Sequence, residues 1–248
     1  MEKLRKRWSP REIVKRLAAE YPDDMSLRIS HEAIYRYIYV LPRGSLKTTL
    51  VKALRQARAY RRKRKSKNHQ ETRGKIVEML SIEERPHEVA DRAIPGHWEG
   101  DLIMGKHQRT ALGTLVERTT RYTLLVPLKA KDATSVRKAY AKALRSLPGE
   151  ITKTLTYDQG KEMSEHKQFT IDTGMTVYFA HPGAPWERGT NENTNGLLRQ
   201  YFPKGTEFDK VSTRESKRVQ RELNDRPRAV LHWQKPTEVI HHLVALKV

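Results

Sequence analysis

Apolar residues near the start of the chain recur at helical spacing. Ser9 and Glu12 form an S-x-x-E capping box, and an apolar face follows it. Pro10 suits the first helical turn, because its missing N–H would have no intrahelical partner there. The pattern predicts a helix from about residue 10 to residue 19, which ends at the Tyr-Pro-Asp-Asp segment of residues 21–24.

A second run of helical spacing begins near Ser30. Its recurring apolar positions are Ala33, Ile34, Tyr37 and Ile38. Two short helices with basic residues around the second are typical of a helix-turn-helix, and Arg36 is a candidate for contact with a DNA major groove. The alternative interpretation of this segment is a helical hairpin with a solvated basic surface.

Residues 46–75 have a different character. Leu46, Leu50 and Leu54 keep a helical period, and an unbroken run of positive charge follows: Arg61, Arg62, Lys63, Arg64 and Lys65. Such a run repels itself and has little to bury, so it predicts a linker or an arm that binds the phosphate backbone of DNA. A charge run that is merely solvated is the alternative.

From Gly96 onward the pattern favours strands. Strands are predicted at 97–104, 113–118, 122–128, 154–157 and 177–180. Helices are predicted from Asp132 or Thr134 to Leu147, at 162–170, and from near Asn191. Three strands followed by alternating helices and strands indicate an α/β fold, with a mixed sheet flanked by helices.

Charge narrows the class of partner. The formal net charge is +20, and residues 1–75 carry +15 of it, from 22 Lys and Arg against 7 Asp and Glu. Nucleic acid is the expected partner of such a basic region. The chain has no cysteine, which excludes disulfides and thiolate metal sites. With no long apolar segment and no signal-peptide pattern, the sequence predicts a soluble, intracellular protein that does not enter membranes.

Three acidic residues stand in distinctive local sequences. Asp101 lies in GHWEGDLIMGK, Asp158 in TLTYDQGKE and Glu192 in PWERGTNENTNGLLRQYF, and 33 residues separate the last two. Alternation along the first predicted strand puts Glu99, Asp101 and Ile103 on one face. A buried carboxylate in mid-strand is costly without a partner, and a metal ion would supply one. The three acids therefore predict a carboxylate cluster that holds divalent metal.

Each acid also has a structural interpretation. Asp158 can cap the following helix, Glu192 can favour the N-terminus of its own helix, and Asp101 can pair with an arginine such as Arg121. Because the chain has 29 acidic residues, spacing alone is weak support and the local sequences carry the prediction. Glu99 is the main rival ligand and Glu187 the next.

Other polar residues near the three acids have candidate roles. The candidates for DNA phosphate contacts are Lys161, Arg188, Arg199 and Lys204, each with an ordinary surface cation as the alternative. Asn191, Asn193 and Asn195 flank or follow Glu192 and could orient it or contact a base, with helix capping favoured for Asn191. Trp186 is interpreted as a core anchor, with packing on DNA as the alternative. The histidines at 97, 166 and 181 lack the spacing of a metal site and are assigned structural or surface roles.

Four segments closely resemble the DDE transposases of the insertion-sequence-thirty family: GHWEGDLI, TLVERTTRYTLLVPL, TYDQGKEM and PWERGTNENTNGLLRQYFPKGT. WSPREIVKRL with ISHEAIYRYIY resembles the second helix-turn-helix that precedes their catalytic core. The resemblance covers nearly the whole chain and is most specific around Glu192. It implies an RNase H-like, retroviral-integrase-type fold, with Asp101, Asp158 and Glu192 as the metal-binding triad.

The resemblance also implies a reaction and its partners. Two Mg²⁺ or Mn²⁺ ions about 3.5–4 Å apart would serve an in-line attack at phosphorus, first by water and then by a DNA 3′-hydroxyl. The partners would be double-stranded DNA, as terminal repeats and as target, and a second copy of the chain, because two DNA ends must meet. The expected location is the bacterial cytoplasm, associated with the nucleoid.

The expected organisation has three parts. Residues 1–45 are predicted to form the helix-turn-helix module, 46–84 a basic helix and linker, and 85–248 the RNase H-like domain. The family usually carries a further N-terminal DNA-binding region, so a fragment or a short relative is expected. Two alternatives remain for function: an inactive or truncated DNA-binding repressor, and a metal-dependent nuclease without strand transfer.

Overall fold

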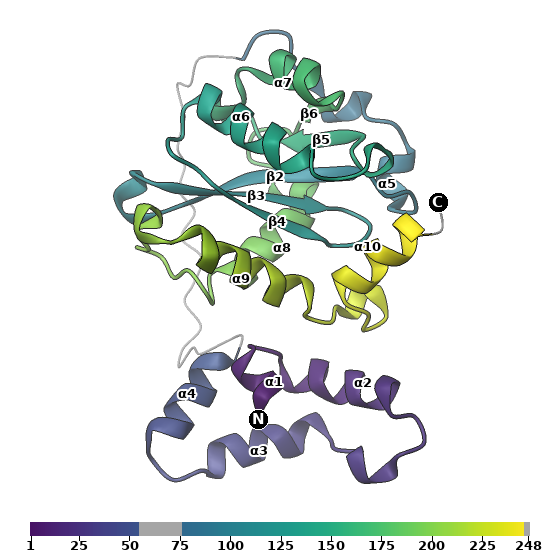
Figure 1. Ribbon diagram of the computed structural model, residues 1–248, viewed down its shortest axis with the longest axis vertical. Helices are drawn as coiled ribbons and strands as arrows, with labels where there is room; N and C mark the ends of the chain where they lie inside the picture. Colours follow the sequence, from purple (N-terminus) through teal and green to yellow (C-terminus); the bar gives the residue numbers. More distant parts are fainter. Residues whose placement is uncertain (55–75, 246–248) are drawn as a thin grey trace. The chain divides into compact units, whose positions relative to one another are not determined.

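The computed structural model describes residues 1–54 and 76–245. Its contacts divide the chain into two compact units. The first unit groups Met1–Gly74 with Arg226–Lys235, and the second groups Lys75–Asp225 with Pro236–Val248 (Figure 1). The charged run at 61–65, a predicted DNA arm, lies outside the described residues.

The described helices of the N-terminal segment are α1 (Glu2–Arg5), α2 (Pro10–Glu20), α3 (His31–Val40) and α4 (Ser45–Ala53), with a 3₁₀ turn at Met25–Leu27. The predicted capping box of α2 is confirmed: Ser9 Oγ accepts the Glu12 N–H, and the Glu12 carboxylate accepts the Ser9 N–H. Ser30 caps α3 in the same way, by accepting the Ala33 N–H. Both helices therefore begin where their capping residues place them.

One hydrophobic core holds these helices together. Its buried side chains are Leu4, Trp8, Ile13, Ile34, Ile38, Leu50 and Leu54. The segment 226–235 belongs to this unit as well: the Arg226 side chain is fully buried, and its Nε lies 2.9 Å from Glu12 Oε2. The sequence pattern assigns these residues to the predicted 85–248 domain, whereas their contacts group them with the N-terminal helices.

The second unit is built on a mixed sheet of six strands. These are β1 (Leu80–Ser81), β2 (His97–Met104), β3 (Ala111–Glu117), β4 (Thr123–Pro127), β5 (Thr154–Tyr157) and β6 (Thr176–Phe179), in the order β1-β6-β5-β2-β3-β4. β1, β6, β5 and β2 pair in parallel, while β2, β3 and β4 pair antiparallel. The predicted mixed sheet is confirmed, and β2 and β5 have the predicted bounds.

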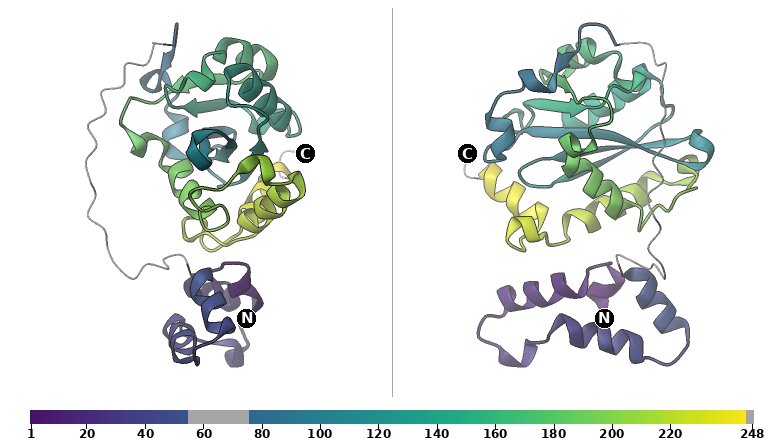
Figure 2. Two further views of the ribbon diagram at one scale, coloured as in Figure 1. Left: turned by 90° about the vertical axis from the view of Figure 1, so that its left-hand side faces the viewer. Right: turned by 180° about the vertical axis from the view of Figure 1, so that it is seen from behind.

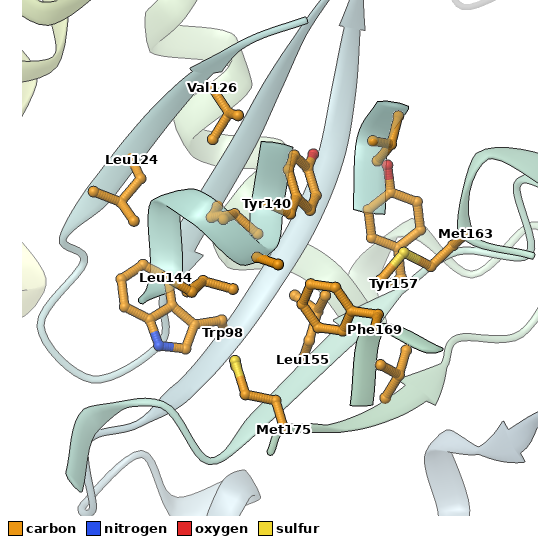
Figure 3. Close-up of a cluster of buried hydrophobic side chains, with 14 of the residues drawn as sticks. Trp98, Leu124, Val126, Tyr140, Leu144, Leu155, Tyr157, Met163, Phe169 and Met175 are labelled. Carbon is orange, nitrogen blue, oxygen red and sulfur yellow. The ribbon is translucent and has the colours of Figure 1, made fainter. Parts of the chain in front are cut away.

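Helices cover both faces of this sheet. α6 (Ala133–Leu144) and α7 (His166–Thr173) lie on one face, and α8 (Gly189–Leu198) and α9 (Thr213–Asn224) on the other (Figures 1 and 2). Trp98 of β2, Tyr140 of α6, Leu155 of β5 and Phe169 of α7 meet in the first core (Figure 3). The second core contains Ile103 of β2, so the predicted alternation along this strand is confirmed.

Some elements differ from the sequence pattern. The helix predicted at 162–170 is a 3₁₀ turn at Lys161–Met163 followed by α7, which Gly174 ends at φ 74°. β1, α5 (Glu88–Asp91), α9 and α10 (Pro236–Ala245) were not predicted. Ser212 caps α9 by accepting the Glu215 N–H, so an S-x-x-E signal before apolar positions was present there. Among the described residues, no helix is long and apolar enough to cross a membrane.

Candidate active site

The pairing of β2 with β5 brings Asp101 and Asp158 to one level of the sheet. The two strands are parallel, with Glu99 opposite Thr156. Carried two residues further, the same register puts Asp158 opposite Asp101, directly after β5 ends. Neighbouring strands lie about 4.8 Å apart, so the two carboxylates start from adjacent backbone positions.

Four neighbours fix Asp101. Its Oδ1 accepts the Leu102 N–H at 2.9 Å, and its Oδ2 accepts Asn195 Nδ2 of α8 at 2.8 Å. Its backbone carbonyl accepts the Tyr140 hydroxyl at 2.8 Å and the Thr114 hydroxyl at 3.1 Å. Both the backbone and the carboxylate of Asp101 are therefore held before any ligand binds.

Gly113 makes the contact from Tyr140 possible. A Cβ at this position of β3 would lie 2.4 Å from a carbon of the Tyr140 ring. Because no side chain intervenes, the fully buried Tyr140 lies close against β3 and its hydroxyl reaches the carbonyl of Asp101. The glycine at position 113 of β3 thus helps to fix Asp101 on the neighbouring strand β2.

Asp158 lies at the start of a tight turn. Its Oδ1 accepts the Gly160 N–H at 3.1 Å, which leaves Oδ2 for another partner. Gly160, and not Asp158, is the N-cap of the 3₁₀ turn that follows, so the predicted helix-capping alternative does not hold. The Asp158 side chain is 41% exposed and that of Asp101 is 27% exposed, so both are accessible from solvent.

Arg188 joins the two acids. Its Nη2 donates to Asp158 Oδ2 at 3.1 Å, its Nη1 donates to the Gly100 carbonyl at 3.0 Å, and Nη1 also lies 3.6 Å from Asp101 Oδ1. The alternative that paired Asp101 with an arginine therefore holds, but the arginine is Arg188 and not Arg121, which donates to Thr190 Oγ1. The arginine of this site comes from the loop before α8.

The charges at this point are strongly coupled. Burial raises the pKa of Asp101, the Arg188 guanidinium opposes that shift, and the nearby Asp158 carboxylate adds to it. Burial works against the charge of Arg188, yet Asp101 and Asp158 together raise the pKa of Arg188 above its ordinary value. The site thus favours a cation placed between the two carboxylates.

A buried polar network fixes α8 on the sheet. The Asn191 N–H donates to Glu99 Oε2 and Asn191 Nδ2 donates to the Glu99 carbonyl, both at 2.8 Å. The Thr114 hydroxyl lies 3.1 Å from both Asn191 Oδ1 and the Asp101 carbonyl, which share its one hydrogen. Arg118 Nη1 lies 3.5 Å from Glu99 Oε1. The interpretation of Asn191 as a helix cap is wrong, since its side chain is buried and joins α8 to β2 and β3.

Glu192 is next to this anchor on α8. It is exposed, and it precedes Asn195 by three residues. Residues three apart share a helix face, and Asn195 contacts Asp101, so Glu192 belongs to the face of α8 that is turned to Asp101. Within 1–54 and 76–245, no three or more His, Asp and Glu side chains are grouped closely enough to hold a metal ion.

The comparisons with known proteins agree with this architecture. The family model for the integrase core domain matches residues 91–185, a range that contains Asp101 and Asp158 and stops before Glu192. The transposase for insertion sequence element IS1086 of Cupriavidus metallidurans is 47% identical over 242 residues, which cover 98% of this chain and 71% of the relative. The chain belongs to the IS30-type insertion-sequence transposases.

Two further relatives support the assignment to this transposase family. Transposase InsI for element IS30A of Escherichia coli is 43% identical over 99% of this chain and 64% of its own length. The transposase for element IS4351 of Bacteroides fragilis is 39% identical over 97% of this chain and 71% of its own length. This chain therefore spans about two thirds of the length of these relatives.

A more distant likeness is to a chain of a solved structure, the simian T-cell lymphotropic virus intasome in complex with the PP2A regulatory subunit B56 gamma. That likeness has a TM-score of 0.43 and 18% identity, over 53% of this chain and 49% of that one. At the level of the family, the predicted transposase function and enzyme class are confirmed by the sequence relatives.

The rival ligands of this transposase chain have other partners. Glu99 is fully buried against Asn191 and Arg118, and the Glu187 carboxylate contacts the backbone N–H and Nδ1 of His181, both at 2.8 Å. His97 and His166 are also buried in separate contacts, with Thr154 Oγ1 and the Val77 carbonyl.

The candidate DNA contacts lie in different environments. Arg36, Lys161 and Lys204 are exposed. Arg199 donates to the Met104 carbonyl at 3.0 Å and to the Phe202 carbonyl at 3.4 Å, so it ties the end of β2 to the segment after α8. The interpretation of Trp186 as a core anchor is wrong, because its side chain is 75% exposed.

Three residues of the site were not assigned their observed roles from the sequence. Asn195 was considered as a residue that orients Glu192 or contacts a base, and it donates to Asp101 instead. Tyr140 and Thr114 were assigned only to a helix face and a strand. A usable signal was the spacing of Asn191 and Asn195, which are four apart and therefore lie along one face of α8.

Proposed function

We propose that this chain cleaves and joins DNA strands with Asp101, Asp158 and Glu192 as the ligands of two Mg²⁺ or Mn²⁺ ions. The observation that carries the proposal is the meeting of Asp101 and Asp158, from neighbouring strands, at one positively charged group. Asn195 links α8, and with it the helix face of Glu192, to Asp101. An acidic pair that already holds a cation, with a third acid supplied from α8, would meet the needs of a metal-dependent phosphoryl transferase.

The donor set fits hard divalent cations. Carboxylate oxygens are the ligands that Mg²⁺ and Mn²⁺ prefer, and the chain has no cysteine to favour softer metals. When bound, such ions supply charge neutralisation at the scissile phosphate and activation of the attacking hydroxyl. Asp101 and Asp158 suit this role because they already lie close enough to share one cation, the guanidinium of Arg188. Glu192 would have to join them from α8.

The residues around the acids keep them in position. Asn195 and the Leu102 N–H each bind one oxygen of Asp101, which fixes the orientation of its carboxylate. The Gly160 N–H binds Oδ1 of Asp158. Phosphoryl transfer depends mostly on positioning and charge, so these hydrogen bonds are expected to contribute to rate without contacting the reacting atoms.

DNA is the proposed substrate and partner. Arg36 is a candidate for contact with the major groove of DNA. It lines an exposed hollow on α3 together with Ser30, Glu32, Ala33, Tyr37 and Val40. Lys161 and Lys204 are candidates for phosphate contacts, as are the five cations of 61–65. Trp186, exposed two residues before Arg188, is a candidate for stacking on a DNA base.

The proposed reaction also implies the form of the DNA and the oligomeric state. We expect the element ends and the target to be double-stranded DNA. We also expect at least two copies of the chain to act together, because two DNA ends must be joined. The proposed location is the bacterial cytoplasm, on the nucleoid.

The test is a cleavage assay with Asp101→Asn, Asp158→Asn and Glu192→Gln, each beside the exposed control Glu150→Gln. We expect Mn²⁺-dependent cleavage of a duplex with element ends to fall by at least about 1,000-fold in the three variants, with DNA binding retained. Full activity in the triple variant would falsify the assignment. Cleavage by the wild type without joining of a pre-cut end would favour the nuclease alternative.

A further inference from the structure

We infer that Arg188 is a tethered cation that holds Asp101 and Asp158 together until DNA arrives, and that Arg188 and a divalent metal ion exclude each other there. The inference rests on the proposed function, because it takes the two acids as metal ligands. It assigns Arg188 a role in the timing of metal binding, in addition to contact with phosphate.

The geometry of Arg188 is that of a bound ligand. Its guanidinium has one nitrogen on Asp158 Oδ2 at 3.1 Å and the other on the Gly100 carbonyl at 3.0 Å, 3.6 Å from Asp101 Oδ1. The side chain is 14% exposed, whereas an ordinary surface arginine extends into water. This arginine therefore occupies the space between the two acids.

Space and charge both oppose joint occupancy. Mg²⁺ takes carboxylate oxygens at about 2.0–2.1 Å in octahedral geometry and needs their lone pairs. The guanidinium contacts Asp158 Oδ2 and lies near Asp101 Oδ1, so it fills the position that an ion shared by the two acids would take. A divalent ion bound by these acids would also lie within a few ångströms of a group of like charge, in a partly buried place where repulsion is poorly screened. Metal binding thus requires the guanidinium to leave.

The local fold explains how Arg188 comes to face inward. The turn Pro185–Arg188 follows β6, and the Glu187 carboxylate clamps it by binding the N–H and the ring of His181. Within this clamped turn Trp186 faces solvent, while Arg188 reaches the two acids. The turn can therefore hold its shape while the long side chain of Arg188 changes partner.

A DNA phosphate is the partner that would draw Arg188 away. The Nε of Arg188 is buried and has no hydrogen-bond partner in the described part of the chain. A phosphate can accept from Nε and one Nη together, a bidentate contact that suits arginine better than two separate carboxylates do. The scissile phosphate must come to these acids in any case, so its arrival would free the carboxylate oxygens.

The exchange couples two binding events. If DNA removes Arg188 from the acids, DNA raises the affinity for metal, and metal raises the affinity for DNA by the same factor. The free protein would then bind Mn²⁺ weakly and the DNA complex would bind it more tightly. Metal would enter mainly when a substrate is present.

The test measures Mn²⁺ binding directly, by electron paramagnetic resonance of free Mn²⁺ with the full chain. We expect Arg188→Gln to bind Mn²⁺ about tenfold more tightly than the wild type without DNA, and Lys142→Gln, an exposed control, to match the wild type. A short DNA duplex, corrected for Mn²⁺ bound by the duplex alone, should raise the wild-type affinity by a similar factor and that of Arg188→Gln much less.

Further variants separate the possible failures. Arg188→Lys keeps the positive charge but loses the paired N–H donors of the guanidinium, so we expect an intermediate Mn²⁺ affinity. This variant replaces Arg188→Gln in the test if thermal melting shows that Arg188→Gln is unfolded. Folded variants of Arg188 that bind Mn²⁺ no better than the wild type would overturn the inference alone. Unchanged Mn²⁺ binding in Asp101→Asn with Asp158→Asn would instead overturn the proposed metal site.

Discussion

Glu99 and Asp101 are two carboxylates on the same face of one strand, and their surroundings differ completely. Glu99 is fully buried, and Asn191 and Arg118 are its partners. Asp101 is 27% exposed and shares Arg188 with Asp158. A shift of two residues along β2 therefore separates an acid that anchors α8 from an acid open to a ligand. Both residues are carboxylates on the same strand face, so only their contacts distinguish the structural residue from the candidate metal ligand.

The largest expected effect is at the anchor. Glu99→Ala would leave Arg118 as a buried charge without its partner and the Asn191 N–H without an acceptor, so we expect a loss of about 3–5 kcal/mol in the free energy of unfolding. Asp101→Asn should change that free energy by less than about 1 kcal/mol, because its side chain is partly solvated. Urea denaturation of both variants measures the contrast, and equal losses would refute it.

Like Glu99, His97 at the start of β2 is a buried ionisable residue. Burial lowers the pKa of His97 to about 4, from an ordinary value of 6.5. Between these two values the unfolded chain binds a proton that the folded chain does not, so stability falls as the pH drops from 6.5 to 4, by up to about 3 kcal/mol. Above pH 6.5 this contribution is constant.

The measurement for His97 is the melting temperature of the wild type and of His97→Gln across the same pH range. Carboxyl groups that titrate near pH 4 affect both proteins, and the difference between the two profiles isolates the histidine. Parallel profiles between pH 4 and 6.5 would show that His97 is not held neutral.

Asn195 contacts the partly exposed Asp101, so we expect its substitution to affect activity more than stability. Asn195→Ala removes the donor to Asp101 Oδ2 and should lower metal-dependent cleavage by about 10–100-fold, as loss of an outer hydrogen bond to a metal ligand does. Asn195→Asp should not rescue activity, because it offers no N–H and adds negative charge. A loss of DNA binding that matches the loss of cleavage would argue against this role.

The smallest expected effect is at Trp186. Trp186→Ala removes an exposed side chain, so folding should be unchanged, while loss of one stacked base should weaken binding of DNA by about tenfold. Trp186→Phe should recover most of the affinity. Fluorescence anisotropy with a labelled duplex that carries a single-stranded end measures both, and wild-type affinity in the alanine variant would exclude stacking.

Much of the fold was predictable because its signals are local. The capping box of α2, the alternation of β2 and the apolar strand β5 each lie within a few consecutive residues. The missed helix α9 carried the same kind of signal at Ser212 and Glu215. The three acids were predicted as a site from their local sequences and family resemblance, and their joint role as metal ligands stays a prediction.

Local patterns in the sequence were enough to predict most of the helices and strands, the basic character of the chain and the acids of its candidate chemistry. The tertiary structure decided which polar groups meet. Arg188 lies 30 residues from Asp158, Asn191 lies 92 from Glu99, and Asn195 lies 94 from Asp101. Such partners are selected by strand register and helix packing, since nothing in the local sequence distinguishes one buried arginine or asparagine from another.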